Sequence, residues 1–247
     1  MKKITTIIFF IIVFSFQAIA EEINVGLEPF PPLINEDGTG VIIDIFNQIS
    51  SHSDLSFNIH LMTYARAKRD LKNHQLDIAG LTPKNNETES FYQYGHELDW
   101  SFKTNVDIFT YQKPPINIKQ LPEYSVGTLL GNAEFFAQVL NMPINKFVEV
   151  SSLPQLVKML AKGRIQSIVF ERISTMTTIK QLNKQGIYYQ KIANIPASLA
   201  VQNNDKGKQL KQKLDQLLIQ SQITIQNKKL EFYNTLTDTG QVSVAKH

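Results

Sequence analysis

The sequence of 247 residues contains no cysteine. This absence excludes a disulfide framework, cysteine-ligated zinc, iron–sulfur clusters and thiol catalysis. The two signs of charge are nearly balanced, since the sequence has 25 Lys and Arg residues and 22 Asp and Glu residues. A net charge of +3 is not the electrostatic footprint of a nucleic-acid-binding protein. The 43% hydrophobic and 19% charged composition is that of an ordinary globular chain, long enough for one large domain or two modest ones.

Long apolar runs are also missing beyond the first twenty residues. Met1-Lys2-Lys3 is a short basic start, residues 4–16 are almost entirely apolar, and Ala18-Ile19-Ala20 places small residues at alternate positions. This order is typical of a secretory signal peptide, and a run of 13 residues falls short of the roughly 20 that cross a bilayer. We expect cleavage after Ala20, which leaves a periplasmic chain with a net charge of 3 − 2 = +1.

Hydrophobic periodicity along the remaining chain predicts an α/β protein. Strand-like and helix-like segments alternate over residues 23–81 and again after Pro114-Pro115, over residues 124–183. The helix expected from Ser152 is the best delimited, with Pro154 in its first turn and Gly163 at its end. An apolar strand at 197–201 and C-terminal helices follow. The pattern indicates two α/β units in tandem.

Several short motifs occur in a characteristic order along these two units. In the first half they are Val25-Gly26, Phe30-Pro31-Pro32, Gly40 followed by Asp44, and Leu76-Asp77-Ile78; in the second, Val126-Gly127, Gly131, and Lys162-Gly163-Arg164-Ile165. Together they resemble the family-3 extracellular solute-binding proteins, over about residues 23–233. Tyr64-Ala65-Arg66-Ala67 is similar to a Trp-x-Arg-Ala variant found in a subgroup of that family.

The resemblance implies a two-lobed, type II periplasmic-binding-protein-like fold with a ligand cleft between the lobes. Lobe 1 would comprise residues 21–111 and 195–247, and lobe 2 residues 112–194. The chain would cross between them near 110–114 and 189–197. Such a protein is expected to be a monomer without a cofactor or metal. It would present a small, amino-acid-like solute to the membrane permease of an ABC importer.

Lobe 1 supplies six candidate ligand-binding residues. By the resemblance, Phe30 and Tyr64 correspond to aromatics on opposite sides of a ligand, although both could be core residues. Leu81 and Thr82 follow the third strand, where the family uses backbone and hydroxyl groups, and Thr82 could instead cap a turn. The arginine with which the family binds an α-carboxylate is absent. Lys84 or Arg66 could substitute, unless Arg66 pairs with Asp70 one helical turn on.

Lobe 2 supplies two more candidates. Gly131-Asn132 opens a helix whose free amides suit an anion, so Asn132 is expected at the site. Glu171 follows a buried strand at the position where the family carries the acid for an α-ammonium, and its alternative role is that of a solvated charge at a strand end. We expect Phe30 and Tyr64 to supply contact area and Glu171 to supply charge selection.

Two other functions remain open from the sequence. Enzymes such as cyclohexadienyl dehydratase share this fold and need a cleft carboxylate, a role that Glu171 could fill. The chain could also be a sensing subunit that docks on a membrane signalling protein. The five histidines show no metal-binding spacing, and the sequence has no Gly-x-Ser-x-Gly or phosphate-binding loop.

Overall fold

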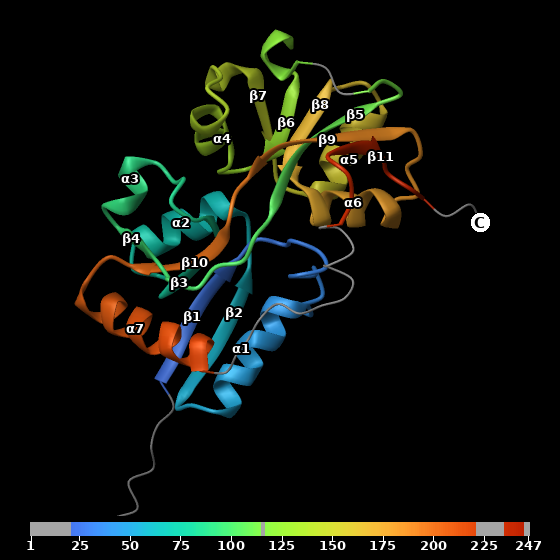
Figure 1. The fold of residues 1–247 in the computed structure, drawn as a ribbon. Coiled ribbons are helices and arrows are strands. Elements are labelled where there is room, and N and C mark those ends of the chain that lie inside the picture. Colours follow the sequence, from blue (N-terminus) through green and yellow to red (C-terminus); the bar gives the residue numbers. More distant parts are fainter. Residues whose placement is uncertain (1–20, 115–116, 221–234, 245–247) are drawn as a thin grey trace, which may run out of the picture.

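The computed structural model describes residues 21–114, 117–220 and 235–244, which form two α/β lobes (Figure 1). The expected signal peptide, residues 1–20, lies outside the described residues, as does the part of the expected C-terminal helix around residues 223–225. Within the described ranges, no helix combines the length and the apolar character needed to cross a bilayer.

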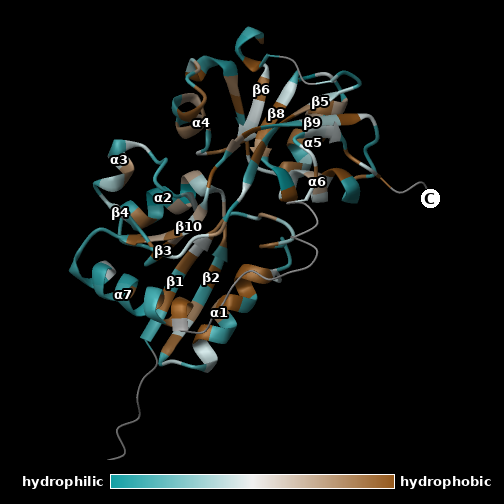
Figure 2. Cartoon of the chain, in the orientation of Figure 1, coloured by the Kyte–Doolittle hydropathy of each residue, from teal (hydrophilic) through white to brown (hydrophobic). Residues whose placement is uncertain are grey.

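Lobe 1 is built on a five-stranded sheet in the order β2-β1-β3-β10-β4. Its strands are β1 (Glu21–Leu27), β2 (Leu55–Leu61), β3 (Ile78–Pro83), β4 (Gly95–Glu97) and β10 (Ala197–Gln202). Its helices are α1 (Val41–Ser51), α2 (Tyr64–Lys72), α3 (Glu89–Tyr92) and α7 (Asp205–Gln220). β1, β2 and β3 are parallel, so the loops after β1 and β3 and the start of α2 meet at one edge of the sheet. Figure 2 shows the apolar residues of α1 and of these strands gathered in the lobe.

Lobe 2 is built on a six-stranded sheet in the order β11-β9-β5-β8-β6-β7. Its strands are β5 (Asn105–Tyr111), β6 (Val126–Leu129), β7 (Phe147–Val150), β8 (Ser167–Glu171), β9 (Ile187–Asn194) and β11 (Thr239–Gln241). Its helices are α4 (Ala133–Val139), α5 (Leu153–Ala161) and α6 (Arg172–Gln181), with 3-10 turns η1 (Ile118–Gln120) and η2 (Ile144–Lys146). The parallel strands β6, β7 and β8 end toward lobe 1, so their loops face the first lobe (Figure 1).

The lobe boundaries differ from the sequence prediction at two places. β5 pairs with both β8 and β9, so residues 105–111 belong to lobe 2 and the first crossing lies between β4 and β5. The composition change at Pro114 marks the end of β5 rather than the crossing. The C-terminal segment also departs from the expected lobe 1 assignment, because β11 pairs with β9.

The two crossings form a short antiparallel ladder between the lobes. Phe102 and Ala197 exchange backbone hydrogen bonds of 3.0 and 2.9 Å. The Thr104 hydroxyl also donates to the Ile195 carbonyl at 2.6 Å. The second crossing runs from the end of β9 to the start of β10, and a two-stranded connection joins the lobes.

A buried ion pair fixes the middle of lobe 2. Arg172, at the start of α6, donates from Nε to Asp107 Oδ2 at 2.7 Å and from Nη2 to Oδ1 at 2.9 Å. Its Nη1 reaches the carbonyls of Leu236 and Thr237 at 3.4 and 3.3 Å. This side chain therefore ties the C-terminal segment to strand β5 and helix α6.

Candidate functional site

Five sequence-predicted residues meet in a small pocket between the lobes. Phe30 follows β1, Leu81 and Thr82 lie on β3, Asn132 precedes α4, and Glu171 ends β8. The rings of Phe30 and Phe170 lie 5.5 Å apart across it. The remaining volume is about 40 Å³, which is space for one or two water molecules. This pocket, called the deep pocket below, is therefore too small to hold an amino-acid-sized solute with the lobes in this arrangement.

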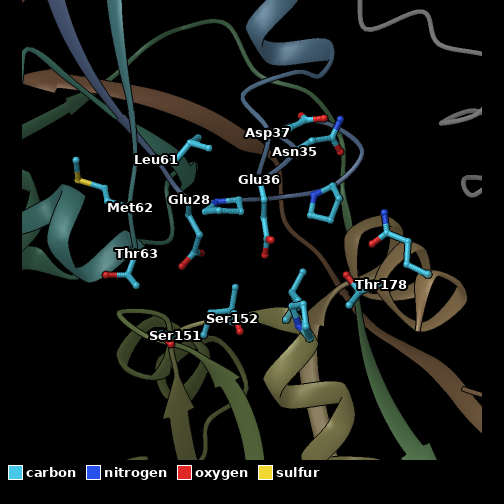
Figure 3. A pocket seen from close by; sticks show the side chains of 16 residues that line it. Glu28, Asn35, Glu36, Asp37, Leu61, Met62, Thr63, Ser151, Ser152 and Thr178 are labelled. Atoms are coloured by element: carbon cyan, nitrogen blue, oxygen red, sulfur yellow. The ribbon is translucent and has the colours of Figure 1, made fainter. Parts of the chain in front are cut away.

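A larger cavity opens beside the deep pocket (Figure 3). Its volume is about 700 Å³, within the range of small-molecule sites. Both lobes line it: lobe 1 through the loop after β1 and the β2–α2 junction, lobe 2 through the end of β6, the β7–α5 junction and α6. The lining residues are Glu28, Pro29, Pro31, Asn35, Glu36, Asp37, Leu61, Met62, Thr63, Leu129, Ser151, Ser152, Leu153, Pro154, Thr178 and Gln181.

Glu28 joins the two spaces, because it lines both. It is 5% exposed, and its Oε1 accepts the Tyr64 amide at the start of α2 at 3.1 Å. Burial raises the pKa of Glu28 to about 8, opposed by the Tyr64 hydrogen bond, the Asn132 side chain and the Lys68 charge. Glu28 is not among the residues predicted from the sequence. An acid directly after the first strand of a parallel sheet was the signal that could have identified it.

Tyr64 lies elsewhere than predicted. Its ring is 1% exposed and lines neither space; its hydroxyl donates to Glu87 at 2.7 Å, and Lys68 Nζ sits 4.6 Å from the ring centroid. Burial, together with the Glu87 carboxylate, raises the pKa of the Tyr64 hydroxyl. Because its hydroxyl has this partner within lobe 1, Tyr64 is a core residue that supports the start of α2.

The two candidate substitutes for the missing arginine also lie outside both spaces. Arg66 Nε donates to Asp70 at 3.2 Å on the surface of α2, which confirms the alternative role considered from the sequence. Lys84 Nζ donates to the Asp99 carbonyl. Neither cation lines a cavity in this closed form, so neither is placed to pair with a carboxylate there.

The amides at the start of α4 already have an acceptor. Glu149, on β7, accepts through Oε1 from the amides of Gly131, Asn132 and Ala133 at 2.8, 3.0 and 2.9 Å. The Asn132 side chain lines the deep pocket, and its Nδ2 also donates to the Leu129 carbonyl at 3.2 Å. The expected anion site is therefore filled by a carboxylate of the chain itself.

Glu149→Ala should lower the free energy of unfolding by about 1 kcal/mol, because three amides lose their shared acceptor at a helix start. Urea denaturation measures this change, and Glu89→Ala on the exposed face of α3 is the matched control. Equal stability of the two variants would contradict the capping role.

Glu171 has a comparable internal role at α6. Its Oε1 accepts from the Ile173 amide at 2.9 Å, and its Oε2 accepts from the amide and hydroxyl of Ser174 at 2.8 and 2.9 Å. Burial raises the pKa of Glu171 to about 7, opposed by these hydrogen bonds. Both oxygens thus serve the helix start, and the side chain also lines the deep pocket. The described residues contain no cluster of three side chains able to hold a metal ion.

Solved structures share this architecture. A histidine kinase sensor domain with similarity to periplasmic binding proteins matches with a TM-score of 0.71 at 16% identity, covering 88% of this chain and 95% of that structure. The arginine-bound, truncated ArgBP from T. maritima matches with a TM-score of 0.67 at 18% identity, covering 81% and 96%. The chain has the two-lobed periplasmic-binding-protein-like fold.

The GluR0 ligand-binding core from Nostoc punctiforme, in complex with L-glutamate, is a third structure with this fold. It matches with a TM-score of 0.66 at 15% identity, covering 86% of this chain and 96% of that structure. No protein-family model and no curated protein matches the sequence.

In this two-lobed fold, the start of α2 touches the turn before α4. The Ala65 amide donates to the Leu130 carbonyl at 3.1 Å, and Lys68 Nζ donates to the Gly131 carbonyl at 2.8 Å. Gly131 has a φ of 93°, and a Cβ there would lie 2.6 Å from the Ala65 nitrogen. The close approach of the lobes therefore requires glycine at this position.

Gly131→Ala should lower the free energy of unfolding by roughly 1–2 kcal/mol, because alanine is strained at the positive φ of this position. The added Cβ should also push the lobes apart. Gly163→Ala is the matched control, since Gly163 has a φ of 66° and no atom within 4 Å of its built Cβ. Small-angle scattering should show a larger radius of gyration for Gly131→Ala alone. The same radius for both variants would refute this contact as a determinant of closure.

Proposed function

We propose that the chain is an exported periplasmic solute-binding protein that holds a small polar solute between its lobes and presents it to an ABC-type importer. The observation that carries this proposal is the cavity of about 700 Å³ lined by both lobes. A solute there contacts both halves, so its binding energy favours their closure.

The hinge and the structural neighbours support this function. Two crossing segments are the connection that a cleft needs in order to open and close as two rigid bodies. Structures of this fold include an arginine-bound protein and an ancestral arginine-binding protein bound to glutamine. Their solutes are small and polar, which is the class that a cavity of this size can enclose.

A second candidate is a ligand-sensing subunit that docks on a membrane signalling protein. The observation that favours it is the match to the histidine kinase sensor domain. Catalysis is less well supported, since the oxygens of Glu171, the acid expected to catalyse, are engaged at the start of α6.

A thermal-shift screen of the exported chain against amines, amino acids, organic acids and short peptides tests the proposal. A solute bound only by the folded state at 100 times its Kd should add about 2.7 kcal/mol of stability and raise the Tm. Scattering should show a compact form with that solute. The intact mass of the same preparation tests removal of residues 1–20, and a screen without any stabilising solute would contradict the binding function.

A further inference from the structure

The charges around the larger cavity have one sign. Among the described lining residues, Glu28, Glu36 and Asp37 are carboxylates, and none is Lys, Arg or His. Figure 3 shows Glu28 and Glu36 extending from the loop after β1 into the space above Ser152, whereas Asp37 lies beside Asn35, away from it. Asp37 accepts from the amide and hydroxyl of Thr39 at 3.0 and 2.6 Å, so it serves its own turn.

Glu28 is the buried member of this group. Its Oε1 has the Tyr64 amide as a partner, and its carboxylate points into the cavity (Figure 3). Lys68, whose charge lowers the pKa of Glu28, is itself engaged with the Gly131 carbonyl at 2.8 Å and with Glu87 at 3.4 Å. Among the described residues no side chain forms an ion pair with Glu28, so its carboxylate has no cation in direct contact there.

Two of the helix starts near the cavity already have acceptors for their amides. Glu149 fills the α4 amides, and in α2 the Tyr64 amide donates to Glu28 and the Arg66 amide to Thr63. The start of α5 does face the cavity, and Ser152 makes no side-chain cap there. Pro154 has no amide to donate, so this helix start offers fewer donors than a full first turn, and the described lining has no cationic side chain to balance Glu28 and Glu36.

We infer that the cavity selects an organic cation, a solute whose ammonium or guanidinium group lies between Glu28 and Glu36. This inference rests on the proposed function, since it names the class of solute for the same cavity. The ligand supplies the counterion that the described residues do not provide for Glu28. A dicarboxylate would instead place its negative charges beside the carboxylates of Glu28 and Glu36, which repel them.

Calorimetry on the exported chain tests this selectivity with three cations, cadaverine, agmatine and spermidine. The matched neutral and anionic probes are 1,5-pentanediol and glutarate, which keep the five-carbon chain of cadaverine. At least one cation should bind, and the diol and the dicarboxylate should bind at least about 30-fold more weakly.

Two variants locate the charge. Glu28→Gln should lower the affinity for the cation about 30-fold or more. Glu36→Gln, at the exposed mouth of the cavity, should lower this affinity several-fold. Glu89→Gln on α3 lies outside the cavity and should bind like the wild type. If Glu28→Gln does not fold, as judged by circular dichroism, Glu36→Gln and the probe series still test the site.

The outcomes separate the two proposals. Binding of glutarate or the diol as tight as that of any cation overturns the cationic selectivity while the binding function stands. Unchanged cation affinity in folded Glu28→Gln and in Glu36→Gln also overturns it. Failure of all three cations, with solutes of other classes stabilising the protein in the thermal screen, overturns the inference alone. Failure of every solute in both experiments overturns the proposed function as well.

Discussion

Arg172→Met should lower the free energy of unfolding by about 3–5 kcal/mol, because it leaves a buried carboxylate without its cation. Asp107 has no exposed surface, and Arg172 supplies both of its charge-assisted hydrogen bonds. The substitution also removes the contacts of Arg172 with the Leu236 and Thr237 carbonyls and with the Tyr189 ring, whose centroid lies 5.0 Å from Cζ. Urea denaturation at pH 7.5 measures the loss.

The pH dependence identifies the cause of that loss. Burial raises the pKa of Asp107 to about 6 even with Arg172 beside it. Without the guanidinium the pKa rises further, so the folded variant retains a proton that the unfolded chain releases above about pH 4. The stability deficit should be smallest near pH 4 and largest above pH 7. Asp107→Leu combined with Arg172→Met should recover much of the deficit, and an equal deficit at both pH values would contradict the ion-pair explanation.

The same pair explains why β5 is not among the strands predicted from the sequence. Asp107 interrupts the apolar pattern of β5, and an aspartate in a central strand is tolerated here because Arg172 reaches it from 65 residues away. Strands without such a partner, such as β1 and β7, follow directly from their apolar pattern. The misplaced boundary at residues 110–114 has the same origin, since β5 was not recognised as a member of the second sheet.

The sequence also predicted part of the small pocket between the lobes. Phe30, Leu81, Thr82, Asn132 and Glu171 come together because they end or follow parallel strands, which a sequence pattern can indicate. The occupation of the α4 amides by Glu149 depends on the packing of β7 beside β6. Contacts of this kind join residues whose pairing no local pattern encodes, and none of the eight residues predicted from the sequence lines the larger cavity.

Glu28→Gln should make the protein progressively more stable than the wild type as the pH rises from 5 to 8. The pKa of Glu28 is raised to about 8 in the folded protein, against about 4.5 in the unfolded chain. Between these values the folded state binds the proton more strongly, so wild-type stability falls with rising pH by up to about 1.4 kcal/mol per unit. Glutamine keeps the side-chain shape and removes this titration. The difference in unfolding free energy between the variant and the wild type should therefore grow by roughly 3–4 kcal/mol across the window.

Denaturation of both proteins at pH 5, 6, 7 and 8 without solute measures this difference, and Glu89→Gln controls for the loss of an exposed carboxylate. A saturating cation should abolish this trend in the wild type, because it stabilises the ionised carboxylate and expels the proton. The Glu28→Gln variant has no proton to expel, so calorimetry in two buffers of different ionisation enthalpy should detect proton release in the wild type alone. A constant difference between the two proteins from pH 5 to 8 would show that Glu28 is already ionised in the folded protein without a ligand.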